Sequence, residues 1–238
     1  MMNRNNLLLA LTLSAALPVT ALAHVTSLGG ALRFGAFESH AALAGASANM
    51  PGLRLGVGGL YRGVDIRARV SYARGDGASL ETFGVRAVAS PRAVLSPYLS
   101  AGMIDLASLT GATGTATAYS VNPTTGVITP TITTTDLPPR GVVMGVAFVG
   151  LRARVALNPR WALAAHAALG AGIGGSVTGL PSTTGSRSPF AMSMGVGMRY
   201  RVGDGSVVAL TYTREVVPVR GATFRSSGVS LTMARTFQ

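Results

Sequence analysis

The chain has 238 residues, carries a formal net charge of +12 and contains no cysteine. This length fits one domain, and in an exported chain the lack of cysteine excludes a disulfide framework and thiol-based catalysis or metal binding. Only 12% of the residues are charged while 48% are hydrophobic, so charged residues are about half as frequent as in a typical soluble domain.

The segment 1–23 has the parts of a secretory signal peptide. Arg4 provides a basic start, an apolar run follows over 7–17, and Ala21-Leu22-Ala23 supplies the small residues of a cleavage site. The apolar run is shorter than the about 20 residues that a membrane-spanning helix needs. We expect cleavage after Ala23, which leaves 24–238 as the mature domain.

Beyond this segment the hydrophobic residues are dispersed by alternation. In 64–72, residues such as Val64 and Ile66 lie on one face, and Asp65 and Arg67 lie on the other. Alternation suits a membrane strand, because one face contacts lipid and the other faces the lumen. The same pattern recurs over 53–58, 82–89, 192–201, 208–213 and 229–234, and less regular strands are expected near 30–38, 95–105, 142–156 and 161–174.

The links between these strands alternate in length. Short links are expected at 61–63, 90–96, 157–160 and 202–205, and longer ones at 39–50, 75–78, 106–140, 175–188 and 216–226. This alternation is typical of outer-membrane barrels, which have tight periplasmic turns and larger outer loops. The Thr-, Gly- and Pro-rich segment 106–140 is then an unstructured surface loop, and an even number of strands places both termini in the periplasm.

The sequence therefore predicts an all-β fold. The expected architecture is a transmembrane antiparallel up-and-down β-barrel of about ten strands over 24–238. Eight strands are the alternative, if 30–38 and one neighbouring segment are not membrane strands.

The most distinctive segments are the signal peptide, 97–103 (Pro-Tyr-Leu-Ser-Ala-Gly-Met), 157–161 (Leu-Asn-Pro-Arg-Trp) and the last strand with its aromatic Phe237. These segments resemble the small outer-membrane β-barrel families of the OmpA and OmpX type, or the broader porin-like barrel domain. The resemblance implies the outer membrane of a Gram-negative bacterium and insertion by the barrel assembly machinery, which reads a C-terminal aromatic residue. Phe237 is penultimate here, and most such relatives have eight strands, so the chain departs from the pattern twice.

The 20 basic residues are all arginine, spread singly through the strands. A basic balance favours nucleic acid as a partner, but export and this even spread argue against one. The alternation points one group into the periplasmic half of the lumen, with Asp65 as the acidic residue beside it. This group is Arg67, Arg69, Arg86, Arg152, Arg154, Arg199 and Arg201.

Two interpretations of these inward arginines remain open. Uncompensated positive charge in a narrow lumen raises the local concentration of anions, which favours an anion-preferring pore or binding site. A barrel of about eight strands is just filled by side chains, however, which favours a filled lumen whose arginines bond backbone, serine and threonine groups.

A second group of arginines is expected on the outer side, in contact with phosphates of outer-membrane lipid and lipopolysaccharide, because the planar guanidinium group suits phosphate. These residues are Arg74, Arg140, Arg187, Arg214, Arg220 and Arg225. Tyrosines 61, 72, 98, 200 and 212, together with Trp161 and Phe237, are expected to form interface girdles.

No catalytic, cofactor or metal site is expected. The acidic residues and His40 predicted at the outer rim have no local motif of outer-membrane proteases, and His166 stands alone in its strand. Three scattered histidines without cysteine form no metal-ligand cluster. The predicted rim residues are Glu38, His40, Asp76, Glu81, Asp105, Asp136 and Glu215.

Three functions are consistent with these features. The first is a structural, adhesive or surface-contact role carried by the outer loops, for a surface ligand that the sequence does not identify. The second is a narrow pore for small anionic or polar solutes. The third is an outer-membrane enzyme, which the missing motifs disfavour.

Overall fold

The computed structural model describes residues 30–111, 113–121, 128–179, 190–203, 205–219 and 221–236, with the side chains of 113–116 and 121 excepted. The predicted signal peptide, Arg187, Arg220 and Phe237 lie outside these ranges. Among the described residues, no helix is long and apolar enough to cross a bilayer.

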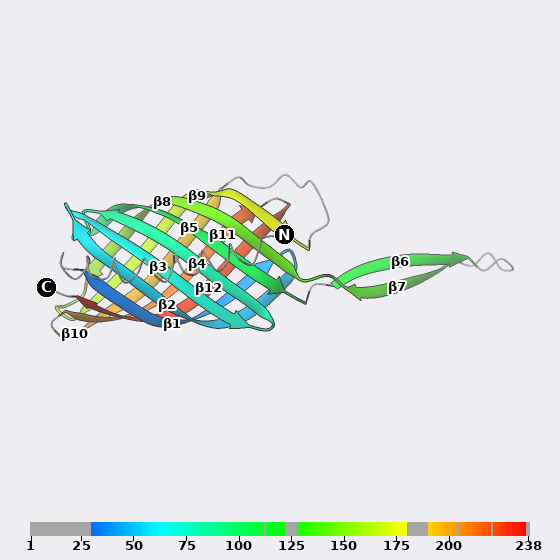
Figure 1. Ribbon diagram of the computed structural model, residues 1–238, viewed down its shortest axis with the longest axis horizontal. Helices are drawn as coiled ribbons and strands as arrows, with labels where there is room; N and C mark the ends of the chain where they lie inside the picture. Colours follow the sequence, from blue (N-terminus) through cyan, green and yellow to red (C-terminus); the bar gives the residue numbers. More distant parts are fainter. Residues whose placement is uncertain are drawn as a thin grey trace, which may run out of the picture.

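Ten strands close into one antiparallel barrel, so the predicted all-β, up-and-down fold is confirmed and the eight-stranded alternative is wrong (Figure 1). Each strand pairs with its neighbours around the ring, and β12 closes the barrel on β1 through a register that runs from Ala31↔Thr236 to Leu43↔Phe224. The barrel strands are β1 (Ala31–Leu43), β2 (Ala46–Tyr61), β3 (Val64–Gly75), β4 (Ala78–Ala89), β5 (Leu95–Leu109), β8 (Arg140–Ala156), β9 (Trp161–Thr178), β10 (Ala191–Gly203), β11 (Ser206–Val219) and β12 (Ala222–Thr236).

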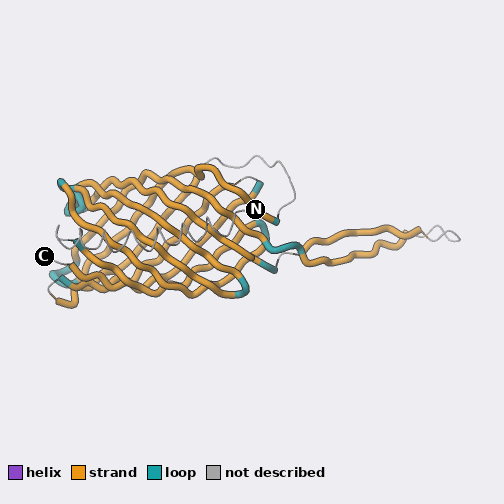
Figure 2. Tube along the Cα trace, viewed as in Figure 1, coloured by secondary structure: helices purple, strands orange, loops and turns teal. Residues whose placement is uncertain are grey.

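The segment predicted as an unstructured loop contains a separate hairpin. β6 (Thr113–Val121) and β7 (Ile128–Asp136) pair with each other in a two-stranded sheet. Figures 1 and 2 show this hairpin projecting from one end of the barrel, which we call the hairpin end. The opposite end, where β1 begins and β12 ends, is the terminal end. Thr and Ile favour extended backbone, which explains the strands despite the low hydrophobicity.

The predicted long links 39–50 and 216–226 are also mostly strand. β1 and β2 pair as far as Leu43↔Ala46, so only Ala44 and Gly45 form the turn. Both have positive φ, 50° and 91°, the arrangement of a tight type I′ hairpin turn, which matches the strand twist. β11 and β12 likewise pair as far as Val219↔Ala222. The barrel wall therefore extends beyond the predicted strand ends.

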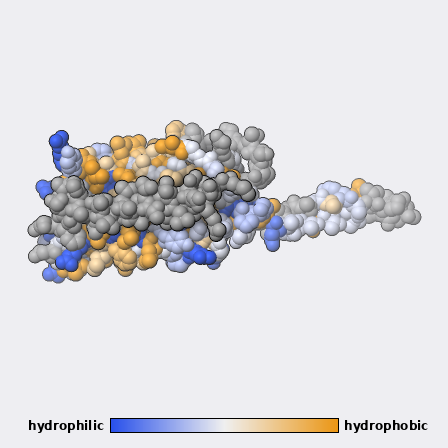
Figure 3. Space-filling model, viewed as in Figure 1, coloured by the Kyte–Doolittle hydropathy of each residue, from blue (hydrophilic) through white to orange (hydrophobic). Residues whose placement is uncertain are grey.

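The outer surface of the barrel carries an apolar band. Outward side chains such as Leu55, Val70 and Phe83 are exposed, and Figure 3 shows hydrophobic residues over the barrel wall with hydrophilic ones at its left-hand, terminal end. Trp161 and Tyr200 lie together at the terminal border, with ring centroids 4.5 Å apart. A closed ring of paired strands with an apolar exterior satisfies its backbone internally and spans a membrane.

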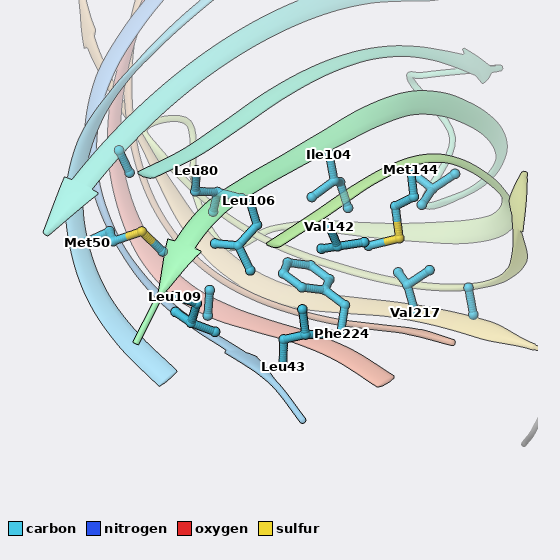
Figure 4. Close-up of a cluster of buried hydrophobic side chains, with 14 of the residues drawn as sticks. Leu43, Met50, Leu80, Ile104, Leu106, Leu109, Val142, Met144, Val217 and Phe224 are labelled. Carbon is cyan, nitrogen blue, oxygen red and sulfur yellow. The ribbon is translucent and has the colours of Figure 1, made fainter. Parts of the chain in front are cut away.

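Near the hairpin end, polar residues take the outward positions of the strands and apolar residues take the inward ones, which is the reverse of the arrangement along the rest of the barrel. In β1 the outward residues change from Phe34 and Ala36 to Glu38 and His40, while Leu43 faces inward and is buried. The outer wall there faces water, so the apolar residues move inside. Figure 4 shows the resulting apolar plug, whose side chains converge in the lumen. The plug comprises Leu43, Met50, Leu80, Ile104, Leu106, Leu109, Val142, Met144, Val217 and Phe224, each at most 4% exposed.

Candidate functional site in the barrel lumen

The arginines predicted in the lumen share the inward face of their strands. Arg67, Arg69, Arg86, Arg152, Arg154, Arg199 and Arg201 alternate with outward apolar residues and lie toward the terminal end. Arg33 on β1 and Arg54 on β2 belong to the same group and were missed. Each shows the same period of two, since Arg54 lies between outward Leu53 and Leu55, so the signal was present in the sequence.

Glycines make room for these long side chains. Across the wall from β1 to β4, one register row reads Arg33, Gly56, Arg69, Gly84. A Cβ atom on Gly58 would lie 2.8 Å from Arg67 Cγ and 2.9 Å from Arg33 Nη1, closer than packed atoms approach. The narrow lumen therefore holds its arginines by alternating the largest and smallest residues.

Two carboxylates face these arginines in the described part of the chain. Arg67 Nε donates to Asp65 Oδ1 at 3.1 Å, and its Nη2 pairs with Asp65 Oδ2. Glu215 Oε1 lies 3.8 Å from Arg69 Nη2 and accepts a hydrogen bond from Ser193 Oγ at 3.4 Å. Asp65 is thus not the only acidic residue beside the arginines. The prediction of Glu215 at the outer rim is wrong, because β11 continues to Val219 and its alternation turns Glu215 inward.

Aromatic rings hold two of the guanidinium groups. Arg86 Cζ lies 4.6 Å from the ring centroid of Tyr98, and Arg54 Cζ lies 4.9 Å from that of Phe37, both within cation–π range. Tyr98 was predicted in an interface girdle but is 2% exposed inside the lumen, because Pro97 and Leu99 take the outward positions. Its ring also meets His166 edge to face, with centroids 6.1 Å apart.

A cavity of about 250 Å³ lies between the arginines and the apolar plug. Arg33, Arg54 and Arg69 line it together with serine and threonine hydroxyls, and Phe37 and Phe148 supply apolar surface. Arg33 Nη1 and Arg54 Nε are buried and have no hydrogen-bond partner among the described atoms. The cavity therefore joins unsatisfied cationic donors to an apolar wall.

The outer arginines separate into two environments. Arg74, Arg214 and Arg225 face outward near the hairpin end and are exposed, as their predicted contact with lipid phosphate requires. Arg140 contradicts that prediction, since it faces inward at the start of β8 and is only 5% exposed. Arg140 lies two residues before Val142 of the apolar plug, so the two side chains share the inward face of β8.

Four of the remaining rim residues in the described ranges lie in two places on the outer wall. His40 Nδ1 lies 2.9 Å from Asn49 Oδ1, and Asp76 accepts a hydrogen bond from the Asn49 backbone N–H at 3.0 Å. Glu81 and Asp105 are register partners on β4 and β5 and face outward. Across the described ranges, no three histidine, aspartate or glutamate residues are grouped to hold a metal ion.

No protein-family model and no curated protein matches the chain. The chain is similar to the solved structure of Neisserial surface protein A, with a TM-score of 0.42, 12% sequence identity, and coverage of 88% of this chain and 97% of that one. It is also similar to the translocator domain of the autotransporter NalP from Neisseria meningitidis, with a TM-score of 0.40, 14% sequence identity, and coverage of 92% of this chain and 96% of that one. It is also similar to the outer membrane protease OmpT from Escherichia coli (TM-score 0.49, 9% identity, 88% and 97%). The ten-stranded closed barrel with an apolar exterior and an arginine-lined lumen is itself the architecture of an outer-membrane β-barrel.

Proposed function

We propose that this barrel is a surface-contact protein of the bacterial outer membrane, which presents the β6–β7 hairpin to a partner outside the cell. The observation that carries the proposal is the projection of this hairpin from the hairpin end of a barrel whose lumen is plugged at the same end. Both termini of the described barrel lie at the opposite end, which corresponds to the periplasmic side in outer-membrane barrels.

The hairpin has the surface of a binding element. Tyr119 and Ile132 are 70% and 68% exposed, and the register Tyr119↔Pro130 places them with Ile128 on one face. Threonines 129, 131, 133 and 135 line the opposite face. A two-stranded hairpin alone is marginally stable in water, and its open edges can pair with an extended segment of a partner. An apolar face and free edges therefore favour a role in contact.

The apolar plug disfavours the pore hypothesis. Leu43, Leu106 and Phe224 are each at most 1% exposed and pack into the lumen. Most side chains that an ion would meet there are apolar, so the ion would lose its hydration and gain few polar partners, which costs several kcal/mol. The inward arginines therefore line a chamber that the plug closes at the hairpin end, and we expect no steady conductance in planar bilayers.

Adhesion of cells displaying the protein tests the proposal. One variant replaces 110–139 with a short turn between Leu109 and Arg140, and adhesion to fibronectin-coated and uncoated polystyrene is compared with that of the unaltered protein. We expect adhesion to fall to the background of cells lacking the protein, while heat-modifiable migration on gels shows an intact barrel.

Two double variants test the two faces of the hairpin separately. Tyr119→Ser with Ile132→Ser removes the exposed apolar surface, and Thr131→Ser with Thr133→Ser is the matched control on the opposite face. The first pair should reduce adhesion and the second should leave it unchanged. Full adhesion by the loop-replacement variant, or steady conductance by the unaltered protein, would refute the surface-contact role.

A further inference from the structure

The lumen cavity combines two kinds of wall within one small space. The cationic wall meets the apolar wall at Arg54 and Phe37, which both line the cavity. The guanidinium group of Arg54 stacks on Phe37, with Cζ 4.9 Å from the ring centroid. Arg33, Arg67, Arg69 and Arg86 complete the cationic side, and Leu80, Ile104, Val146 and Phe148 complete the apolar side.

The arginines of the cationic side outnumber the carboxylates that face them, and one of these carboxylates, Glu215, also lines the cavity. Asp65 is engaged by Arg67, and Glu215 reaches Arg69 only at 3.8 Å. Arg33 Nη1 and Arg54 Nε, both buried, find no acceptor among the described residues. Buried charge without a partner is costly, and charge-assisted hydrogen bonds to an anion offset that cost. An anion in the cavity would therefore gain more here than at an exposed arginine.

The size and the apolar side restrict what that anion is. The cavity volume of about 250 Å³ lies near the lower end of the about 300–1,000 Å³ that is usual for small-molecule sites, so the ligand is small. Phe37 and Phe148 offer aromatic surface that an inorganic ion would leave unused. The complementary ligand has one anionic group and one small apolar or aromatic group.

We propose that the cavity is a binding site for a small amphiphilic anion, such as an aromatic or short aliphatic carboxylate or phosphate ester, which enters from the terminal end. The apolar plug closes the other end. Arg154 and Arg201, inward and exposed near the terminal end, draw anions toward the lumen. This site is independent of the hairpin, so it does not rest on the surface-contact role.

Isothermal titration of the purified full-length barrel in detergent tests the site with three probes. Phenyl phosphate carries both groups, inorganic phosphate carries only the charge, and phenol carries only the ring. Phenyl phosphate should bind at least about tenfold more tightly than either fragment, since each side of the cavity contributes. Equal affinity for phenyl phosphate and inorganic phosphate would overturn the apolar side of the proposal, and no binding would overturn the site.

Variants locate the binding. Arg54→Gln should weaken phenyl phosphate about tenfold or more by removing a charge-assisted hydrogen bond, and Phe148→Leu should reduce the preference over inorganic phosphate. Arg235→Gln, on the outward face of β12, is the matched control and should bind normally. Binding that persists in Arg54→Gln would overturn the assignment.

Where Arg54→Gln fails to fold, thermal unfolding of the unaltered barrel decides the matter. Phenyl phosphate should then raise the melting temperature more than inorganic phosphate does, at equal ionic strength. An equal effect of the two ions would refute the site. Replacement of the hairpin should leave this binding unchanged, which separates failure of this site from failure of the surface-contact role.

Discussion

Replacement of Phe224 by alanine tests whether the apolar plug stabilises the barrel. Phe224 is 1% exposed and faces Leu43 across the β1–β12 pair and Val217 across the β11–β12 pair. Because these contacts lie near the hairpin end, where the outer wall faces water, lipid does not replace them when the side chain is removed. The plug should therefore behave like the core of a soluble protein.

The expected magnitude follows from the buried area. A phenylalanine side chain that buries about 150 Å² contributes about 4 kcal/mol at about 25 cal/mol per Å². Measured replacements of buried phenylalanine by alanine cost about 3–5 kcal/mol, including the cavity that they leave. We expect Phe224→Ala to lower the free energy of unfolding by about 3–5 kcal/mol.

Equilibrium urea unfolding of the barrel in lipid vesicles measures this change, with the fluorescence of Trp161, the one tryptophan of the chain, as the signal. Tyr119→Ala on the exposed hairpin is the control, and it should change stability by no more than about 0.5 kcal/mol. A loss below about 1 kcal/mol in Phe224→Ala would contradict a packed plug, since such a value is typical of a site that water already reaches.

Four further variants probe the lumen and the outer border. In Gly58→Ala the new Cβ would lie 2.8 Å from Arg67 Cγ, so the free energy of unfolding in urea should fall by about 1–3 kcal/mol. Gly59→Ala is its control, because the nearest atom lies at 3.6 Å, and it should lower the free energy of unfolding by less than about 1 kcal/mol. Asp65→Asn leaves Arg67 without its carboxylate and should cost about 1–3 kcal/mol, a loss that added sulfate should partly reverse. Arg214→Ala should weaken the stabilisation of the folded barrel by lipopolysaccharide in heat-modifiability gels; an unchanged response would exclude contact of this arginine with lipid phosphate.

The sequence predicted the strands in which opposite chemistries alternate. In β3, Arg67 and Arg69 face the lumen while Ile66 and Val70 face lipid, and no other register buries the charges. The end of β1 was missed because Ala41 and Ala42 are both small, so alternation leaves no contrast between its two faces.

The sequence did not predict the hairpin or the lumen positions of two residues, and the reasons differ. Nearly every residue of β7 is threonine, proline or isoleucine, and all of its residues are exposed, so no hydrophobic period marks it. Glu215 and Tyr98 were assigned by their expected distance from a strand end. A shift of that end by a few residues moves a side chain from a loop to the lumen, whereas counting in steps of two places both correctly.

The change from apolar to polar outward residues along each strand predicts where the membrane ends. Outward Leu55 of β2 lies in the apolar band, while outward Asn49 of the same strand lies beyond it. Arginine on the lipid face of a barrel costs about 2–4 kcal/mol near the bilayer midplane and about 0–1 kcal/mol near the interface. Leu55→Arg should therefore lose about 2–4 kcal/mol in urea unfolding from vesicles, and Asn49→Arg about 0–1 kcal/mol.

The comparison also discriminates between a membrane barrel and a soluble one. In detergent-free water, an arginine replacing exposed Leu55 would cost little, because surface substitutions usually change stability by less than about 0.5 kcal/mol. Equal and small losses in the two variants would therefore contradict the lipid-facing band itself. A large loss confined to Leu55→Arg would locate the border between Leu55 and Asn49. Near that level apolar residues begin to fill the lumen, because the outer wall there exchanges lipid for water.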